Sequence, residues 1–125
     1  MPQDRTSFAR SEAYLLGIDV GTGSARAGLF DRDGRMVAAD KRDIALWREG
    51  AEIAEQSSND IWSAVCEAVR GAVAKAGIEP SLVAGIGFDA TCSLVVLGDG
   101  GRPLPVGRSG NPERNIIVWM DHRAI

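Results

Sequence analysis

The sequence predicts an α/β domain with a mixed sheet, in which an antiparallel three-strand meander is followed by a crossover helix and a parallel fourth strand. Two apolar segments of strand length, Tyr14–Val20 and Ala25–Asp31, flank a glycine-rich turn. The turn signal Asp33-Gly34 follows too soon for a parallel crossover, so the second segment must return antiparallel to the first. One long helical pattern then leads to a further strand, Leu82–Phe88.

The first part of the chain divides into an arm and three strands. Residues 1–12 are polar and mixed in charge, which is typical of a flexible arm, and the domain is expected over 13–125. Tyr14–Val20 is almost continuously apolar, which predicts a strand covered on both faces. Arg35–Ile44 is the third predicted strand. From Ala45 to Ser57 the pattern lapses, which predicts a loop.

A helix follows this predicted loop. Ser57-Ser58-Asn59-Asp60 is a cluster of N-cap formers, and apolar residues recur after it at spacings of three and four as far as Ala76. Gly77 ends the pattern as a C′ residue. Three further apolar segments follow, the first two of them predicted strands: Leu82–Phe88, Ser93–Leu97 and Asn115–Trp119.

The turn between the first two strands has the composition of a phosphate site. Its glycines and hydroxyls, Gly21–Ser24, leave backbone N–H groups free to bind an anion. Asp19 immediately precedes the turn, and a carboxylate repels phosphate unless a cation bridges them, so Asp19 implies Mg²⁺. A plain glycine-rich hairpin is one alternative. A dinucleotide fingerprint is another, but Arg26 replaces its third glycine and no helix fits before Asp33-Gly34.

A second acidic turn follows the fourth strand. Asp89 is followed by two hydroxyl residues, just as Asp19 is. If the meander runs up, down and up, a right-handed crossover makes the fourth strand parallel to the third and therefore to the first. The two carboxylates are then expected at one edge of the sheet, outside the carboxyl ends of neighbouring strands, where open α/β sheets bind ligands.

Composition excludes several classes of partner. The formal net charge is −3, so neither nucleic acid nor an anionic membrane is expected as a partner. No apolar run reaches the length of about 20 residues that spans a bilayer, and residues 1–12 contain no signal-peptide core. Cys66 and Cys92 lack metal or redox spacing, and a cytoplasmic location is expected.

Four motifs resemble the N-terminal domain of the FGGY carbohydrate kinases: Gly17–Arg26, Ala54–Ser57 ahead of Ile61-Trp62, Gly85–Ser93, and Trp119–Arg123. The Phe88–Ser93 turn and the ending after Asn115 look most like the pentulose kinases of the ribulokinase kind, especially the D-ribulokinase-like branch. The resemblance implies the ribonuclease-H-like fold of the actin and sugar-kinase ATPases. It also implies that residues 13–125 are the leading, incomplete part of that domain.

The resemblance also implies roles for individual residues. Those facing the ATP phosphates and Mg²⁺ would be Asp19, Gly21, Thr22, Gly23 and Ser24. Arg26 would stabilise the transferred phosphoryl group, so Asp19 and Arg26 are the expected catalytic residues and Asp19 the metal ligand. Those bordering the sugar would be Asp89, Ala90, Thr91, Cys92, Asp121 and Arg123.

The expected function is ATP-dependent phosphorylation of a terminal sugar hydroxyl. The expected substrate is a ketopentose such as D-ribulose. The aspartate base and the adenine pocket of the family lie downstream, so the chain alone is expected to be inactive. An absent second domain would leave apolar surface uncovered, which predicts a homo-oligomer, most simply a dimer. The alternatives are a non-catalytic actin-like nucleotide-binding module and an interaction domain whose glycine turns are structural.

Overall fold

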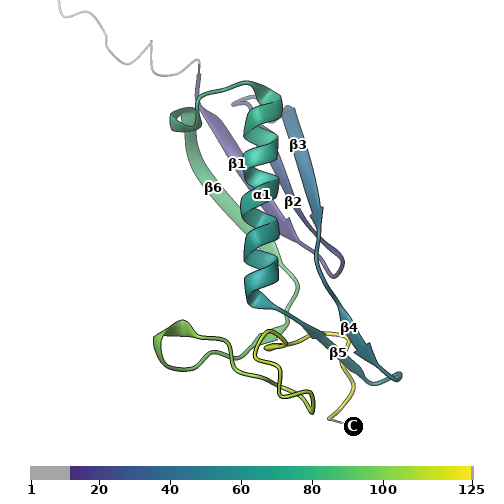
Figure 1. Ribbon diagram of the computed structural model, residues 1–125. Coiled ribbons are helices and arrows are strands. Elements are labelled where there is room, and N and C mark those ends of the chain that lie inside the picture. The colour runs from purple at the N-terminus through teal and green to yellow at the C-terminus, as the bar shows by residue number, and fades with distance from the viewer. Residues whose placement is uncertain (1–11, 125) are drawn as a thin grey trace, which may run out of the picture.

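Two sheets and one long helix account for most of residues 12–124, which the computed structural model describes (Figure 1). The larger sheet has the order β3-β2-β1-β6 and the smaller one the order β4-β5-β8-β7. The strands of the larger sheet are β1 (Tyr14–Val20), β2 (Ser24–Phe30), β3 (Met36–Asp43) and β6 (Val83–Ala90). Those of the smaller sheet are β4 (Trp47–Glu49), β5 (Ile53–Gln56), β7 (Leu94–Val95) and β8 (Ile116–Ile117). The helices are α1 (Ser58–Ala76) and two short 3₁₀ turns, η2 (Pro80–Leu82) and η3 (Asp99–Gly101).

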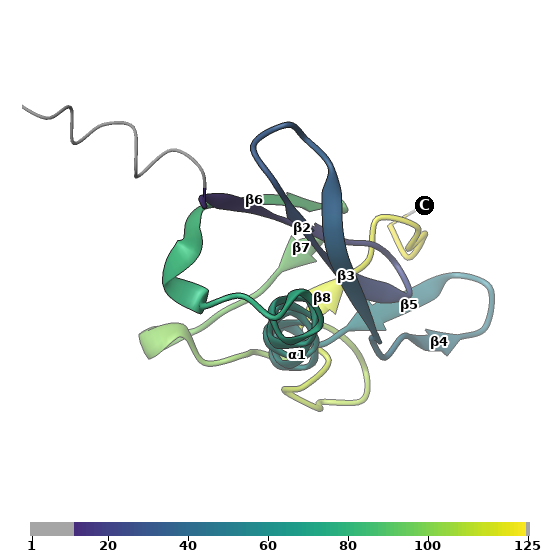
Figure 2. The ribbon, with the colours of Figure 1, turned by 90° about the horizontal axis from the view of Figure 1, so that it is seen from above.

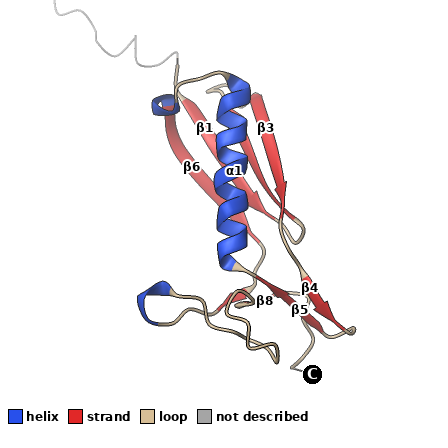
Figure 3. Ribbon diagram, in the orientation of Figure 1, coloured by secondary structure: helices blue, strands red, loops and turns tan. Residues whose placement is uncertain are grey.

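The larger sheet confirms the predicted mixed α/β fold. β1 pairs antiparallel with β2, and β2 pairs antiparallel with β3. After α1 the chain returns as β6, which pairs parallel with β1. The meander, the crossover helix and the parallel fourth strand therefore occur in the predicted order, and Figure 3 shows the helix lying along the sheet.

The core lies between α1 and one face of this sheet. Leu16, Ile18 and Val20 alternate along β1 and are buried against the small residues of α1, among them Ala68 and Ala72. The prediction that β1 is covered on both faces is wrong for the described part of the chain, because Leu15 is 53% exposed. Figure 2, from above, shows α1 on one side of the sheet, and no second long helix among residues 12–124 covers the other side.

The ends of α1 follow the predicted capping chemistry. The Ser57 hydroxyl accepts a hydrogen bond from the backbone N–H of Asp60 at 3.1 Å, which satisfies one free donor of the first turn. Gly77 closes the helix with a φ of 65°, a conformation that favours glycine. No helix among residues 12–124 combines the length and apolar character needed to cross a bilayer.

Several element boundaries differ from the prediction. The predicted loop from Ala45 to Ser57 instead contains the hairpin β4–β5. Its strands are short and carry no clear local alternation, and β5 pairs with β8 more than fifty residues away, so the local pattern did not predict them. The fifth strand shrinks from Ser93–Leu97 to β7 and joins the smaller sheet. The fourth strand extends to Ala90. The predicted arm, residues 1–12, lies outside the described residues except for Glu12.

Candidate functional site

The glycine-rich turn joins β1 to β2 as the tip of a β-hairpin. The Gly21 N–H donates to the Ser24 carbonyl at 2.9 Å, which closes the turn. The Gly23 carbonyl accepts from the Ile44 N–H at 3.1 Å, so the end of β3 supports the turn from one side. A Cβ atom placed on Gly23 would meet nothing within 4 Å. The turn is therefore open to a ligand at this point.

Three charged residues lie in a row across the sheet beside this turn. In the antiparallel register Arg26 of β2 is opposite Asp19 of β1, and in the parallel register Asp19 is opposite Asp89 of β6. The guanidinium of Arg26 forms an ion pair with the Asp19 carboxylate, and both side chains are about half exposed. Because their neighbours Ile18 and Val20 face α1, Asp19 and its partners lie on the opposite face. The prediction that the two carboxylates share one edge is confirmed.

The donor set at Asp19 suits Mg²⁺ shared with a phosphate. Among residues 12–124 no group of three or more acidic, histidine or cysteine side chains forms a metal cage. Mg²⁺ does not require one, because it binds through one or two carboxylates together with phosphate oxygens and water. Asp19 is about half exposed beside the open turn, so it can supply the carboxylate while a phosphate and water supply the other ligands. Asp19 and the turn therefore fit a hard divalent cation that a nucleotide would also bind.

Thr22, at the tip of the turn, is held by two side chains from distant segments. The Gln56 amide donates to the Thr22 carbonyl oxygen at 2.6 Å. The Trp119 indole donates to the Thr22 hydroxyl at 3.1 Å. Sequence reasoning assigned no role to Gln56, which fell in the predicted loop. The signal that could have found it was the motif Ala54–Ser57, in which Gln56 is the one neutral amide.

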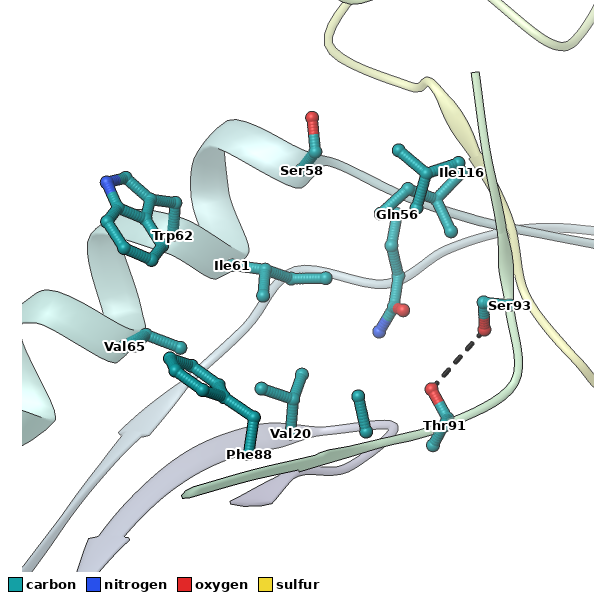
Figure 4. A pocket seen from close by; sticks show the side chains of 12 residues that line it. Val20, Gln56, Ser58, Ile61, Trp62, Val65, Phe88, Thr91, Ser93 and Ile116 are labelled. Atoms are coloured by element: carbon teal, nitrogen blue, oxygen red, sulfur yellow. Dashed lines mark hydrogen bonds between the residues drawn. The ribbon is translucent and has the colours of Figure 1, made fainter. Parts of the chain in front are cut away.

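The second acidic turn lies against the end of β1. The Thr91 N–H donates to the Val20 carbonyl at 3.1 Å, and the Thr91 and Ser93 hydroxyls share a hydrogen bond of 3.3 Å (Figure 4). The backbone N–H of Trp119 donates to the Ser93 hydroxyl at 3.2 Å. The structure thus brings the second turn and the Trp119 segment together. Asp89, Ala90 and Cys92 are exposed at this turn.

An apolar cavity of about 250 Å³ lies between α1 and β6, directly behind the second turn (Figure 4). Ile61, Trp62 and Val65 of α1 line one side, and Val20 and Phe88 line the other. Gln56, Thr91 and Ser93 provide polar groups at one end. Trp62 and Phe88 are both more than half exposed.

Asp121 and Arg123 lie in a buried network of charges. The Arg123 guanidinium bonds both oxygens of Asp121, at 2.8 and 2.6 Å, and also reaches Glu55 at 3.0 Å. Arg114 bonds the second oxygen of Glu55 at 2.6 Å. The Asp121 and Glu55 side chains are each 1% exposed.

The Arg123 hydrogen bonds hold the pKa of Asp121 well below its usual range, and Asp121 in turn raises the pKa of Arg123. Asp121 also accepts a hydrogen bond from the Ala54 N–H at 2.8 Å, so both of its oxygens are occupied within the fold. This geometry anchors the segment that carries Trp119. Direct contact of Asp121 and Arg123 with a sugar stays a prediction.

The mixed sheet, the open hairpin turn and the row of charges define a class of protein, the actin-like ATPase fold to which the sugar kinases belong. The sequence profile of the "FGGY family of carbohydrate kinases, N-terminal domain" matches residues 14–125. The chain belongs to this family, as the sequence motifs predicted.

Two curated relatives and one solved structure illustrate the similarity. A human FGGY carbohydrate kinase domain-containing protein is 47% identical over 116 residues, which are 93% of this chain and 21% of the relative. A D-ribulokinase of Saccharomyces cerevisiae is 46% identical over 114 residues, 90% of this chain and 16% of the relative. The ligand-bound xylulose kinase of Lactobacillus acidophilus has a TM-score of 0.69 at 27% identity, covering 87% of this chain and 20% of the other. The chain spans about a fifth of the length of the curated relatives it matches.

Proposed function

We propose that this chain supplies the phosphate turn and part of the acceptor site of an ATP-dependent sugar kinase. The reaction is transfer of the γ-phosphoryl group to a terminal hydroxyl of a ketopentose, with D-ribulose as the preferred substrate. The observation that carries the proposal is the row Arg26–Asp19–Asp89 across three adjacent strands, beside an open glycine turn. Family membership and the similarity to a D-ribulokinase support it.

The phosphate turn has the parts that phosphoryl transfer needs. The Gly21 N–H closes the turn by donating to the Ser24 carbonyl, so the backbone N–H groups left for phosphate oxygens are those of Thr22, Gly23 and Ser24. Asp19 would hold Mg²⁺ beside them. When bound, Mg²⁺ neutralises charge on the phosphates. Arg26 provides a fixed cation for the transferred group, whose transition state is loose and spreads charge over three oxygens. Arg26 leaves its ion pair with Asp19 in this step, which both residues permit because they are half exposed.

The second turn supplies the acceptor side. Asp89 and Thr91 bind substrate hydroxyls, while Ala90 and Cys92 shape the wall of the site. Asp121 and Arg123, which bond each other, lie just after Trp119. The Trp119 N–H bonds Ser93 of the second turn, so we place Asp121 and Arg123 on the acceptor side as well. Sites that hydrogen-bond hydroxyls discriminate strongly against analogues that lack them, because buried polar groups are then left unpaired. The base that takes the hydroxyl proton and the adenine pocket are expected on a second domain.

Self-association and a cytoplasmic location complete the proposal. The exposed apolar residues around β6 and Trp62 favour contact between copies of the chain, most simply as a dimer. Both cysteines of the described residues are free thiols, which is compatible with a reducing compartment.

The test is a substrate panel. A protein of the relatives' length that carries residues 14–125, called here the full-length kinase, is assayed with ATP against pentuloses, pentitols, glycerol and hexoses. D-ribulose is expected to give the highest kcat/KM, ahead of L-ribulose and ribitol. A hexose or glycerol as best substrate would overturn the pentulose assignment and leave the kinase assignment. Nucleotide binding without transfer to any sugar would instead favour the non-catalytic module.

A further inference from the structure

Thr22 is the point at which the two halves of the proposed site meet. Its carbonyl oxygen accepts from Gln56, 34 residues away in the chain, and its hydroxyl accepts from Trp119, 97 residues away. One residue of the phosphate turn is thus held through its backbone by β5 and through its side chain by the segment after β8. The two contacts differ in rigidity, and that difference suggests different roles.

Gln56 is a rigid support. The residue is 1% exposed, and its backbone pairs with Ile116 in the smaller sheet. Its neighbour Glu55 is fixed by Arg114 and Arg123, and its other neighbour Ser57 caps α1. A short hydrogen bond from an immobile amide fixes the orientation of the peptide group that follows Thr22. That peptide group contains the N–H of Gly23, one of the donors that face a phosphate in this turn.

Trp119 is an adjustable contact. The residue is 56% exposed, so its indole can move, whereas its backbone N–H is bound to the Ser93 hydroxyl at 3.2 Å. Ser93 also bonds Thr91 of the second turn. A chain of hydrogen bonds therefore runs from Thr91 through Ser93 and Trp119 to the Thr22 hydroxyl, that is, from the acceptor turn to the phosphate turn.

We propose that Gln56 is a positioning residue for the phosphate turn, and that the Trp119–Thr22 hydrogen bond couples acceptor binding to nucleotide binding. The identity of the two ligands rests on the proposed function; the two contacts do not. An acceptor that immobilises Trp119 also immobilises the Thr22 side chain. Phosphate binding then requires less ordering of the turn, which is positive cooperativity between the two ligands.

The first arm of the test uses the 125-residue chain and needs no ligand. The chain contains three tryptophans, so a ¹⁵N–¹H spectrum resolves three indole N–H signals, and Trp119→Phe identifies the third by its loss. Thr22→Val removes the acceptor hydroxyl and preserves the shape of the side chain. The Trp119 indole proton should shift upfield and exchange faster, while the signals of Trp47 and Trp62 stay in place. An unchanged Trp119 signal would overturn the coupling contact.

The second arm uses the full-length kinase. Gln56→Met keeps the volume of the side chain but removes the amide that donates to the Thr22 carbonyl. Gln56→Asn keeps the amide but shortens the side chain by one methylene, which moves the amide away from Thr22. Both should weaken ATP·Mg²⁺ binding about fivefold, the worth of one such hydrogen bond, and leave sugar binding alone unchanged. The milder Asn variant keeps the test decisive if the Met variant unfolds. Unchanged nucleotide Kd values in a folded variant would overturn the role of Gln56.

The coupling is measured as the ratio of ATP·Mg²⁺ Kd values without and with saturating sugar. In the parent kinase this ratio should exceed one, and in Trp119→Phe and Thr22→Val it should fall to about one. Trp62→Phe is the matched control, because Trp62 on α1 is similarly exposed at 62%, whereas the indole that bonds the Thr22 hydroxyl is that of Trp119. A retained ratio in Trp119→Phe would refute the proposal. Failure of the proposed function would be distinct, because the parent would then phosphorylate no sugar.

Discussion

At the scale of single residues, two carboxylates of the same type have different neighbours. Asp19 faces the cation Arg26 on one side and the open glycine turn on the other. Asp89 lies on the outer strand of the sheet, beside the hydroxyls of Thr91 and Ser93. The first position suits a phosphate-bound cation, and the second suits the hydroxyls of a sugar.

The proposed roles of Asp89 on the sugar side and Arg26 on the phosphate side predict different kinetic effects of their alanine substitutions in the full-length kinase. Asp89→Ala should raise the sugar KM about tenfold or more, with a much smaller change in the KM for ATP, because it removes acceptors for substrate hydroxyls. Arg26→Ala should act mainly on kcat, because the guanidinium is used in the transition state. Steady-state kinetics with each substrate varied in turn measures both. Equal effects of both variants on the two KM values would contradict the assignment.

At the scale of elements, buried charges join segments that are far apart in sequence. Glu55 on β5 accepts from Arg114 and Arg123, and Arg114 also bonds Glu49 on β4 at 2.6 Å. The hairpin β4–β5 is thereby tied to the segment that carries Asp121. Since Gln56 follows Glu55 directly, this network also fixes the strand from which the phosphate turn is supported.

Asp121 makes the stability of this network depend on pH. Its pKa is held below the ordinary value by Arg123, so its contribution to stability is complete above the unfolded pKa of about 4. That contribution is lost as the pH falls from there toward the lower folded pKa. Asp121→Asn should therefore lower the free energy of unfolding by about 2 kcal/mol at pH 7, and the gap to the parent should narrow at pH 3.

Urea unfolding of the 125-residue chain at the two pH values measures this gap. Asp99→Asn, which alters an exposed carboxylate in η3, serves as the control and should leave stability unchanged at both. A gap between parent and Asp121→Asn that stays constant or widens at pH 3 would contradict the account.

Some elements of the fold could be predicted from the sequence, and others could not. The hairpin β1–β2 follows from local apolar runs and a short turn. The parallel direction of β6 and β1, which brings Asp19 and Asp89 to one edge of the sheet, follows from strand parity and the handedness of the crossover. The hairpin β4–β5 could not be found in this way, because its strands have only three and four residues and β5 pairs with the distant Ile116–Ile117. Gln56 was missed for the same reason. Its contact with Thr22 forms only in the folded chain.

At the scale of the whole molecule, α1 covers β1, β2 and β3 but leaves the same face of β6 exposed. Ile86 and Phe88 are 59% and 61% exposed there, and Trp62 of α1 lies across the cavity. β6 is also the edge of its sheet, so its outer backbone groups are unpaired within the sheet. An apolar edge strand of this kind promotes association between copies.

The 125-residue chain is therefore expected to self-associate at micromolar concentrations. Phe88→Glu should shift it toward monomer, because a charge at the centre of the edge cannot be buried between two copies. Sedimentation velocity over a concentration series measures the change. Val37→Glu, on the opposite edge strand β3 where the side chain is 43% exposed, is the matched control and should leave association intact. A parent chain that stays monomeric throughout would contradict the prediction.

We propose above that Asp19 and the turn beside it bind the metal and phosphates of a sugar kinase. The most direct test is sugar-dependent ADP release by the full-length kinase carrying Asp19→Asn, compared with Asp31→Asn. Asp31 accepts two backbone hydrogen bonds through one oxygen at the far end of β2, a role that an amide oxygen retains. We predict that Asp19→Asn lowers kcat at saturating Mg²⁺ by about two orders of magnitude or more with the fold intact, because an amide bridges Mg²⁺ and phosphate poorly, whereas Asp31→Asn has little effect. Near-parental turnover of Asp19→Asn would contradict the account and reduce Asp19 to a structural partner of Arg26.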